Sequence, residues 1–302
     1  MGIVLGPTQY GKAETRVVRI YRDGPEHPIR DLNVSTALRG EFVDAHLRGD
    51  QASVLPTDTQ KNTVYAYAKE KGVGAIEEFA LALARHFVDD VAPVRMARVD
   101  VDEYGWERVV ADGQPHPHAF VRSGQEIRTA TAIVVGAGST RLTWVLSGLR
   151  DLVLLKSTGS EFAGFLKDRY TTLAETHDRV LATSLTARWR YVRPDDVDFD
   201  AAYADARGLL IERFAAVHSL ALQQTLWEMG RAVLDADKDI AEVRLSAPNK
   251  HHFLVDLAPF GLENPGEVFH ADDRPYGLIQ CAVQRDDAPP AGPSWEPPAS
   301  FA

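Results

Sequence analysis

The first half of the chain alternates extended stretches with one helical pattern. β-branched residues crowd the stretch from Arg16 to Tyr21, an Asp-Gly-Pro run interrupts it, and a second extended stretch covers Ile29 to Val34. This order predicts a hairpin. Apolar side chains then recur at helical spacing from Ile76 to Phe87, which predicts an amphipathic helix. Another strand pair is expected over Val94 to Val101 and around Ala119 to Arg122.

The second half repeats this order. Extended stretches are expected over residues 127–135, 142–149 and 180–192, helices over 203–217 and 222–233, and strands over 243–246 and 252–257. Asp198 or Asp200 is a suitable cap for the first of these helices. The sequence therefore predicts an α+β chain of two similar units, residues 1–126 and 127–302. The proline-rich end, residues 286–302, is predicted to be an extended arm.

Charge and cysteine content narrow the classes of partner and compartment. The 33 lysines and arginines against 43 aspartates and glutamates give a net charge of −10, which disfavours nucleic acid but permits a small anion. No apolar run approaches the ~18 residues of a membrane span. The single cysteine, Cys281, excludes an internal disulfide and lies in a stretch that predicts a buried strand with a packed thiol. The last residues, Ser300 to Ala302, are not a peroxisomal Ser-Lys-Leu signal, so the cytoplasm is expected.

Common cofactor motifs are missing, and two histidine pairs remain as candidates. Gly136-Ala137-Gly138 begins like a dinucleotide fingerprint, but Arg141 stands where the third glycine would be. The pair His116 and His118 has no further metal ligand at a convincing spacing, so we interpret it as a turn with exposed histidines. His251 and His252 open an apolar strand after a polar run, which is a common place for a functional site.

The polar run from Thr57 to Thr63 precedes a helical pattern and has two interpretations. Thr57 or Asp58 could cap the helix, which explains the residue types without any function. Alternatively, the free backbone N–H groups at the start of a helix could hold an anion. The residues alone leave both interpretations open.

A set of motifs resembles the urate oxidase family. They occur in the family's order over nearly the whole chain, although the stretch from Val91 to Val110 has no recognised counterpart. The motifs are Tyr10-Gly11-Lys12, Thr57-Asp58-Thr59-x-Lys61-Asn62-Thr63, Leu155-Lys156-Ser157-Thr158-x-Ser160-x-Phe162, Tyr170-Thr171-Thr172-Leu173, Asp178-Arg179, Pro248-Asn249-Lys250-His251, Glu267-Val268-Phe269 and Pro275-x-Gly277-Leu278-Ile279.

The resemblance implies a fold and an assembly. Each half would be a tunnelling-fold unit, an antiparallel sheet with helices on one side. The family forms a homotetramer in which the sheets close into a β-barrel tunnel, and closure pairs exposed strand edges. The active sites would lie between subunits. The missing peroxisomal signal would indicate a bacterial form.

The resemblance also implies the residues that bind urate, a flat anionic ring. Phe162 would stack on the ring, while Arg179 and Gln223 would bond its polar edge. Backbone N–H groups of Thr57 and Asp58, from the neighbouring subunit, would meet the opposite edge. The pocket walls would be Leu173 and Leu222. Without the resemblance, Phe162 would be interpreted as a core residue, Arg179 as a salt-bridged strand residue and Gln223 as an exposed helix residue.

The implied reaction is the oxidation of urate by O2 and water to 5-hydroxyisourate and hydrogen peroxide, with no metal or organic cofactor. Lys12 would be the ultimate base, Thr57 would pass the proton through its hydroxyl, and His251 would orient or recharge the relay. Asn249 would hold oxygen, and later water, above the ring. Two alternatives stay open: a metal-dependent purine or pterin enzyme on the same fold, and a purine-binding sensor without activity.

Overall fold

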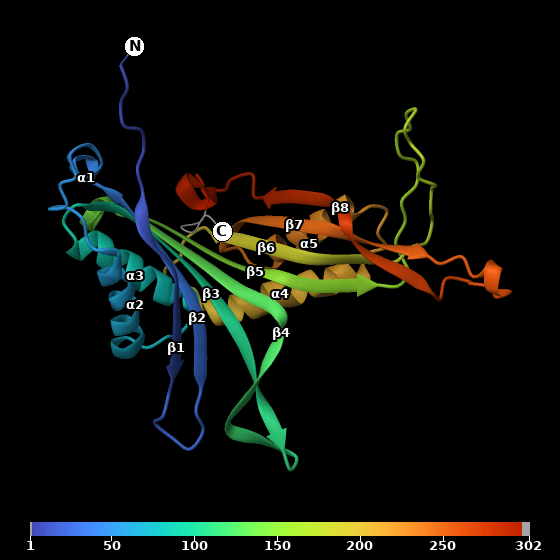
Figure 1. Ribbon diagram of the computed structural model, residues 1–302, viewed down its shortest axis with the longest axis horizontal. Coiled ribbons are helices and arrows are strands. Elements are labelled where there is room, and N and C mark those ends of the chain that lie inside the picture. The colour runs from blue at the N-terminus through green and yellow to red at the C-terminus, as the bar shows by residue number, and fades with distance from the viewer. Residues whose placement is uncertain (1, 298–302) are drawn as a thin grey trace. The chain divides into compact units, whose positions relative to one another are not determined.

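The computed structural model describes residues 2–297; Met1 and the last part of the predicted tail, residues 298–302, lie outside the described residues. The fold is α+β, with eight strands that pair in the order β1 to β8 (Figure 1). The strands are β1 (Tyr10–Ile20), β2 (Ile29–Gly40), β3 (Val94–Ala111), β4 (Gln114–Val135), β5 (Leu142–Lys156), β6 (Leu181–Tyr191), β7 (Ile240–Leu254) and β8 (Phe269–Gln284). The α-helices are α1 (Val43–Arg48), α2 (Thr57–Glu70), α3 (Ile76–Asp90), α4 (Phe199–Ala216) and α5 (Leu222–Ala236). Within residues 2–297, no helix has both the length and the apolar character needed to cross a membrane.

The chain divides into two compact units. The first contains the residues up to Gly148, the segment Arg190–Ala201 and the residues from Pro289 on; the second contains Leu149–Trp189 and Ala202–Ala288. Strand β4 runs without a break through residue 126, where the sequence analysis placed a boundary. The division into two tunnelling-fold units at that residue stays a prediction.

The first unit is an antiparallel sheet covered by helices. Strands β1 to β4 pair antiparallel, and helices α2 and α3 pack against them (Figure 1). The helical spacing from Ile76 to Phe87 is confirmed, since Phe79, Leu83 and Phe87 on α3 are all buried. Strand β1 begins at Tyr10, six residues before the predicted stretch, because Tyr10 still pairs with Leu38 of β2.

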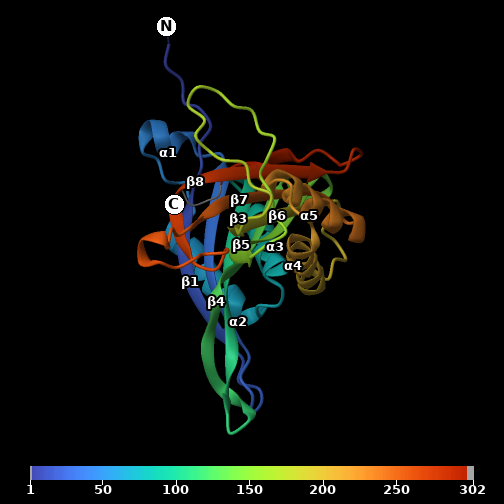
Figure 2. The same cartoon turned by 90° about the vertical axis from the view of Figure 1, so that its right-hand side faces the viewer.

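The end of β3 and the beginning of β4 form a twisted two-stranded ribbon (Figure 2). Its turn is Asp112-Gly113, with φ of 50° and 75°, which is the backbone that a two-residue hairpin requires. His116 and His118 therefore lie on strand β4 beyond the turn, not in the turn itself, with ring centroids 4.5 Å apart. The prediction of exposed histidines is confirmed for His118, whereas His116 is half-buried.

The second unit places α5 against β7 and β8, which pair antiparallel. The predicted apolar face of α5 is confirmed: Leu226, Met229 and Val233 are buried. The two strands expected over 243–246 and 252–257 are one strand, β7, with a register shift between Asn249 and His251. The polar run in the middle of β7 does not end the strand because pairing with β8 continues on both sides of the shift.

The prediction that Cys281 is packed in the core was wrong. Its strand, β8, lies at the end of the strand order, and the thiol is half-buried instead of packed in the core. Val283 is the one buried residue on β8. An edge strand has a neighbour on one side only, so the apolar run from Leu278 to Val283 does not guarantee burial in a single chain. Partial burial raises the pKa of the Cys281 thiol.

The described part of the C-terminal tail packs on the first unit. The side chain of Arg98 donates a 3.0 Å hydrogen bond to the carbonyl of Glu296, and Arg190 donates one of 2.9 Å to the carbonyl of Pro289. A short 3₁₀ turn, η3 (Gly292–Trp295), contains the buried Ser294. The described part of the predicted extended arm is thus held by arginine–carbonyl bonds and contains a 3₁₀ turn.

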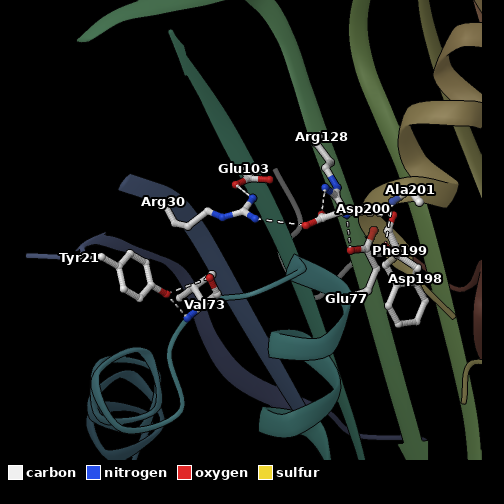
Figure 3. A network of polar contacts seen from close by, with 10 residues as sticks. All are labelled: Tyr21, Arg30, Val73, Glu77, Glu103, Arg128, Asp198, Phe199, Asp200 and Ala201. Atoms are coloured by element: carbon white, nitrogen blue, oxygen red, sulfur yellow. Dashed lines mark hydrogen bonds and ion pairs between the residues drawn. The ribbon is translucent and has the colours of Figure 1, made fainter. Parts of the chain in front are cut away.

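A partly buried ion-pair network connects α3, the sheet of the first unit and the start of α4 (Figure 3). The carboxylate of Glu77, fully buried on α3, accepts a 2.7 Å contact from Arg128 on β4. Arg128 also contacts Asp200 at 2.5 Å, and Arg30 bridges Asp200 and Glu103. The expected cap of α4 is confirmed for Asp198, whose carboxylate accepts the N–H of Ala201 at 3.0 Å.

Candidate active site

Lys12 lies on β1, where the backbone approaches β2 unusually closely. A Cβ at the neighbouring Gly11 would lie 1.8 Å from the carbonyl oxygen of Thr36, so only glycine fits there. The N–H of Lys12 donates to the hydroxyl of Thr36 at 3.3 Å, and this hydroxyl donates to the buried side chain of Gln60 at 2.7 Å. Because Gln60 belongs to α2, the backbone of Lys12 is tied to the first turns of that helix.

Thr57 and Asp58 open α2, and neither caps it. The N-cap is Pro56, and no side chain there bonds the helix start, so the capping interpretation was wrong. Pro56 has an extended backbone, with φ −53° and ψ 140°, and its carbonyl accepts the N–H of Gln60 at 3.1 Å, so the helix begins there without a side-chain cap. The carboxylate of Asp58 accepts a 2.5 Å hydrogen bond from Lys61 and a 3.1 Å bond from the amide of Asn62. These contacts, Lys61 first, lower the pKa of Asp58, and the charge of Lys12 contributes in the same direction.

Phe162 and Arg179 meet across a short two-stranded ladder in the second unit. The N–H of Phe162 donates to the carbonyl of Thr176 at 2.8 Å, and the reverse bond is 3.0 Å. The N–H of Arg179 donates to the carbonyl of Ser160 at 2.9 Å. These bonds hold the Arg179 guanidinium 5.7 Å from the centroid of the Phe162 ring. Phe165 stacks on Phe162 at 4.9 Å.

The Arg179 side chain is half-buried and its hydrogen bonding is incomplete. Among the described residues, its buried Nε has no hydrogen-bond partner, and burial lowers the pKa of the guanidinium. The interpretation of Arg179 as a salt-bridged strand residue receives no support from its surroundings. A desolvated cation with a free donor above an aromatic ring is suited to a planar anion.

The remaining predicted pocket residues lie on α5, on β7 and in the segment before Arg179. Leu222 is buried at the start of α5, and the adjacent Gln223 is exposed. Leu173 is 60% exposed. Asn249 and His251 flank the register shift in β7, and the His251 ring stacks on that of Phe253 at 5.7 Å.

The predicted site residues thus form two groups. The first unit contains Lys12, Thr57 and Asp58 around the start of α2, and the second unit contains the other seven. Within residues 2–297, no cluster of three or more His, Cys, Asp or Glu side chains has a geometry that could hold a metal ion.

Comparison with known proteins identifies the family. The family model described as Uricase matches residues 8–133 and 145–280 of this chain, which includes both groups of site residues and the stretch from Val91 to Val110. The chain belongs to the uricase family. Membership makes it a urate oxidase, an enzyme of purine degradation whose substrates are urate and O2.

Uricases from distant organisms are similar to it over most of their length. The uricase of Arthrobacter globiformis is 51% identical over 299 residues, with 99% of this chain and 96% of that protein covered. The uricase of Aspergillus flavus is 36% identical over 291 residues, covering 92% and 95%. The crystal structure of the Arthrobacter globiformis uricase superposes with a TM-score of 0.91 and covers 98% of this chain and 99% of that one. The α+β fold is therefore that of uricases.

Two sets of supporting residues in this uricase were missed by the sequence analysis. Thr36 and Gln60 connect Lys12 to α2, and Glu161 contacts both His177 and His218 next to Phe162. Gln60 occupies an unspecified position of its motif, and His218 lies far from Phe162 in the sequence. No spacing rule would have found either set, because the contacts depend on tertiary structure.

Proposed function

We propose that this chain oxidises urate to 5-hydroxyisourate and hydrogen peroxide without a metal or an organic cofactor, at a site built from the two groups of residues. The observation that carries the proposal is the half-buried Arg179 guanidinium beside the Phe162 ring, in a chain of the uricase family. The ring of Phe162 would stack on urate, and Arg179 with Gln223 would bond its polar edge. Leu173 and Leu222 would shape the pocket.

The proton relay would run from urate through the hydroxyl of Thr57 to Lys12. Removal of a proton makes urate a stronger electron donor towards O2, which reacts slowly with closed-shell molecules. The bonds from Lys12 to Thr36 and from Thr36 to Gln60 support this role, since they fix β1 against the helix that begins at Thr57. His251 would orient the relay, and Asn249 would hold O2 and then water.

The complete site would form between subunits of a homotetramer, with Thr57 and Asp58 reaching urate from a neighbouring chain. The two ends of the strand order support this assembly. Val18 on β1 and Leu278 on β8 are each 54% exposed, so both edge strands present apolar side chains that pairing between subunits would cover. We also propose the cytoplasm as its compartment, since one cysteine fits a reducing environment; recovery in a periplasmic or secreted fraction would contradict this.

Replacing Arg179 by alanine is expected to weaken urate binding. Loss of hydrogen bonds to a charged group costs about 1.5–3 kcal/mol, roughly a 10- to 150-fold rise in KM. The measurement is steady-state turnover of urate at varied concentration, with Arg169→Ala as a control because Arg169 is an exposed arginine of the same segment. An unchanged KM in Arg179→Ala would remove Arg179 from the binding site.

Chelator-treated protein in air is expected to consume urate and release an equal amount of hydrogen peroxide. The measurement combines urate absorbance, a peroxide assay and elemental analysis of the same sample. Iron or copper bound at one per subunit, with activity lost on its removal, would contradict the cofactor-free proposal. Bound urate without turnover would favour the purine-binding sensor.

A further inference from the structure

Glu161 occupies a junction between three segments of the second unit. It stands between Ser160 and Phe162, the two residues that bridge to neighbouring segments: Ser160 to Ser219, and Phe162 to Thr176. Its own N–H donates a 2.6 Å hydrogen bond to the carbonyl of Ser219. The backbone of Glu161 is thereby fixed on both sides.

The carboxylate of Glu161 joins two histidines from different segments. Oε1 lies 2.6 Å from Nε2 of His218, and Oε2 lies 3.0 Å from Nδ1 of His177. An ionised carboxylate only accepts hydrogen bonds, so both histidine nitrogens must donate, which fixes the protonated nitrogen of each ring. These two bonds, that of His218 first, lower the pKa of Glu161. The Glu161 carboxylate is therefore a charged acceptor, and each of its two oxygens accepts a hydrogen bond from one histidine.

Each of the three connected segments leads directly to a residue of the proposed pocket. Phe162 follows Glu161, and Arg179 is two residues beyond His177. His218 lies in the short connection between α4 and α5, four residues before Leu222 and five before Gln223. The Glu161 carboxylate thus joins the segment that contains Phe162 to the segments that lead to Arg179 and to Gln223.

We propose that Glu161 is a positioning residue for urate binding, which acts through His177 and His218 to hold the Phe162, Arg179 and α5 segments in register. This inference rests on the proposed binding site. Arg179 and Phe162 extend from a segment with little regular structure, Glu161 to Val180, so their geometry depends on such cross-links. A small displacement of either group weakens its contacts with a rigid, planar ligand.

The test is the effect of Glu161→Ala and Glu161→Gln on the kinetics of the full-length oligomer with urate. Glu161→Ala is expected to raise KM about five- to tenfold, the loss of one or two hydrogen bonds, with kcat changed less than about twofold. Glu161→Gln is expected to recover part of this loss, because an amide accepts from one histidine and donates to the other. The matched control is Glu175→Gln, since Glu175 pairs with Lys167 at 2.7 Å in the same segment and, among the described residues, forms no hydrogen bond or ion pair with either histidine.

If Glu161→Ala also lowers the thermal unfolding midpoint, a second variant is needed to separate loss of the contact from loss of stability. His218→Ala removes the partner ring and leaves the backbone bonds of residue 161 in place, and it should raise KM similarly. The double variant Glu161→Ala/His218→Ala should be no worse than Glu161→Ala alone, because Glu161→Ala already removes the contact with His218 as well as that with His177. Additive effects, or a fall in kcat without a rise in KM, would overturn the positioning role.

Failure of the inference is distinguishable from failure of the proposed site. If Arg179→Ala raises KM and Glu161→Ala does not, Glu161 has no positioning role and the binding site stands. If Arg179→Ala leaves KM unchanged, the binding site itself is wrong, and a KM effect of Glu161→Ala could not then be transmitted through Arg179.

Discussion

Replacing Lys12 by alanine is expected to lower kcat by about 100- to 10,000-fold, the usual contribution of a positioned general acid or base. Binding of urate should change little, because the proposed contacts of the ring are with Phe162, Arg179 and the start of α2. The backbone bond from Lys12 to Thr36 does not depend on the lysine side chain, so β1 should keep its position in the variant. The measurement is kcat and KM for urate, with equilibrium binding of urate in the absence of O2.

The control for this prediction is Lys69→Ala. Lys69 is an exposed lysine in the last turn of α2, far along the helix from Thr57, and its loss changes the net charge by the same amount. Normal turnover in Lys12→Ala would exclude Lys12 as the base. An equal loss of turnover in both variants would attribute the effect to overall charge.

Co-expression of two impaired variants, assayed at a urate concentration well below the raised KM of Arg179→Ala, tests whether the site is shared between subunits. Chains with Lys12→Ala keep Arg179, and chains with Arg179→Ala keep Lys12. If Thr57, Asp58 and Lys12 serve a neighbouring chain, mixed oligomers contain some sites with both native groups, and part of the activity returns. If all ten site residues act within one chain, mixing restores nothing.

The elements of the core could be predicted from the sequence because local periodicity decides them. The apolar spacing of Phe79, Leu83 and Phe87 fits only one face of a helix, and that face is buried. The same holds for Leu226 and Met229 on α5. Asp198 as a cap also follows from local chemistry, since its bond spans three residues.

The errors in the prediction come from features that local pattern does not contain. The end of a strand depends on its partner: β7 continues through Pro248-Asn249 because β8 pairs on both sides. Cys281 is only half-buried, since its strand β8 lies at the end of the strand order and has one neighbouring strand. Pro56 is the N-cap of α2 and provides no polar side chain, although Thr57 and Asp58, the next two residues, are of types that usually cap helices.

The site residues were predicted through family motifs, whereas their supports were not. The proposed pocket residues were assigned one by one from the family resemblance, and their contact with urate stays a prediction. Glu161, His218 and Gln60 act through contacts between segments distant in the sequence, so they appear only in the folded chain. The first group, around Lys12, depends on a close backbone approach at Gly11, which the sequence marks only as a glycine.

Replacing Arg128 by methionine is expected to lower the free energy of unfolding by about 3–5 kcal/mol, the cost of leaving a buried charge without its partner. Glu77 is fully buried on α3, and after the substitution its carboxylate would keep the hydroxyl of Ser147, at 2.5 Å, but no cation. The double variant Arg128→Met/Glu77→Gln should recover much of the loss, since the unpaired charge is then absent. Denaturant unfolding at a fixed protomer concentration measures both, because assembly also contributes to stability.

The dependence of this loss on pH separates an unpaired charge from a packing defect. Burial raises the pKa of Glu77, and the contacts with Arg128 and Ser147 oppose that shift. Without Arg128, burial should therefore raise the pKa of Glu77 further. A carboxyl group whose pKa is higher in the folded than in the unfolded state binds its proton more tightly when folded. Its penalty is absent below the unfolded pKa of about 4.3, grows as pH rises from there towards the folded pKa, and is constant above it. The destabilisation of Arg128→Met should therefore be smaller near pH ~5 than near pH ~8.

Arg30→Met is the matched control, because Arg30 belongs to the same network and its partners Glu103 and Asp200 are more accessible to water than Glu77. Exposed or half-exposed pairs contribute about 0–1 kcal/mol, so this variant should lose far less stability. Equal losses in the two variants, or a loss in Arg128→Met that is the same at both pH values, would contradict the assignment of the effect to Glu77. A loss confined to Arg128→Met at the higher pH would assign the destabilisation to the unpaired charge of Glu77.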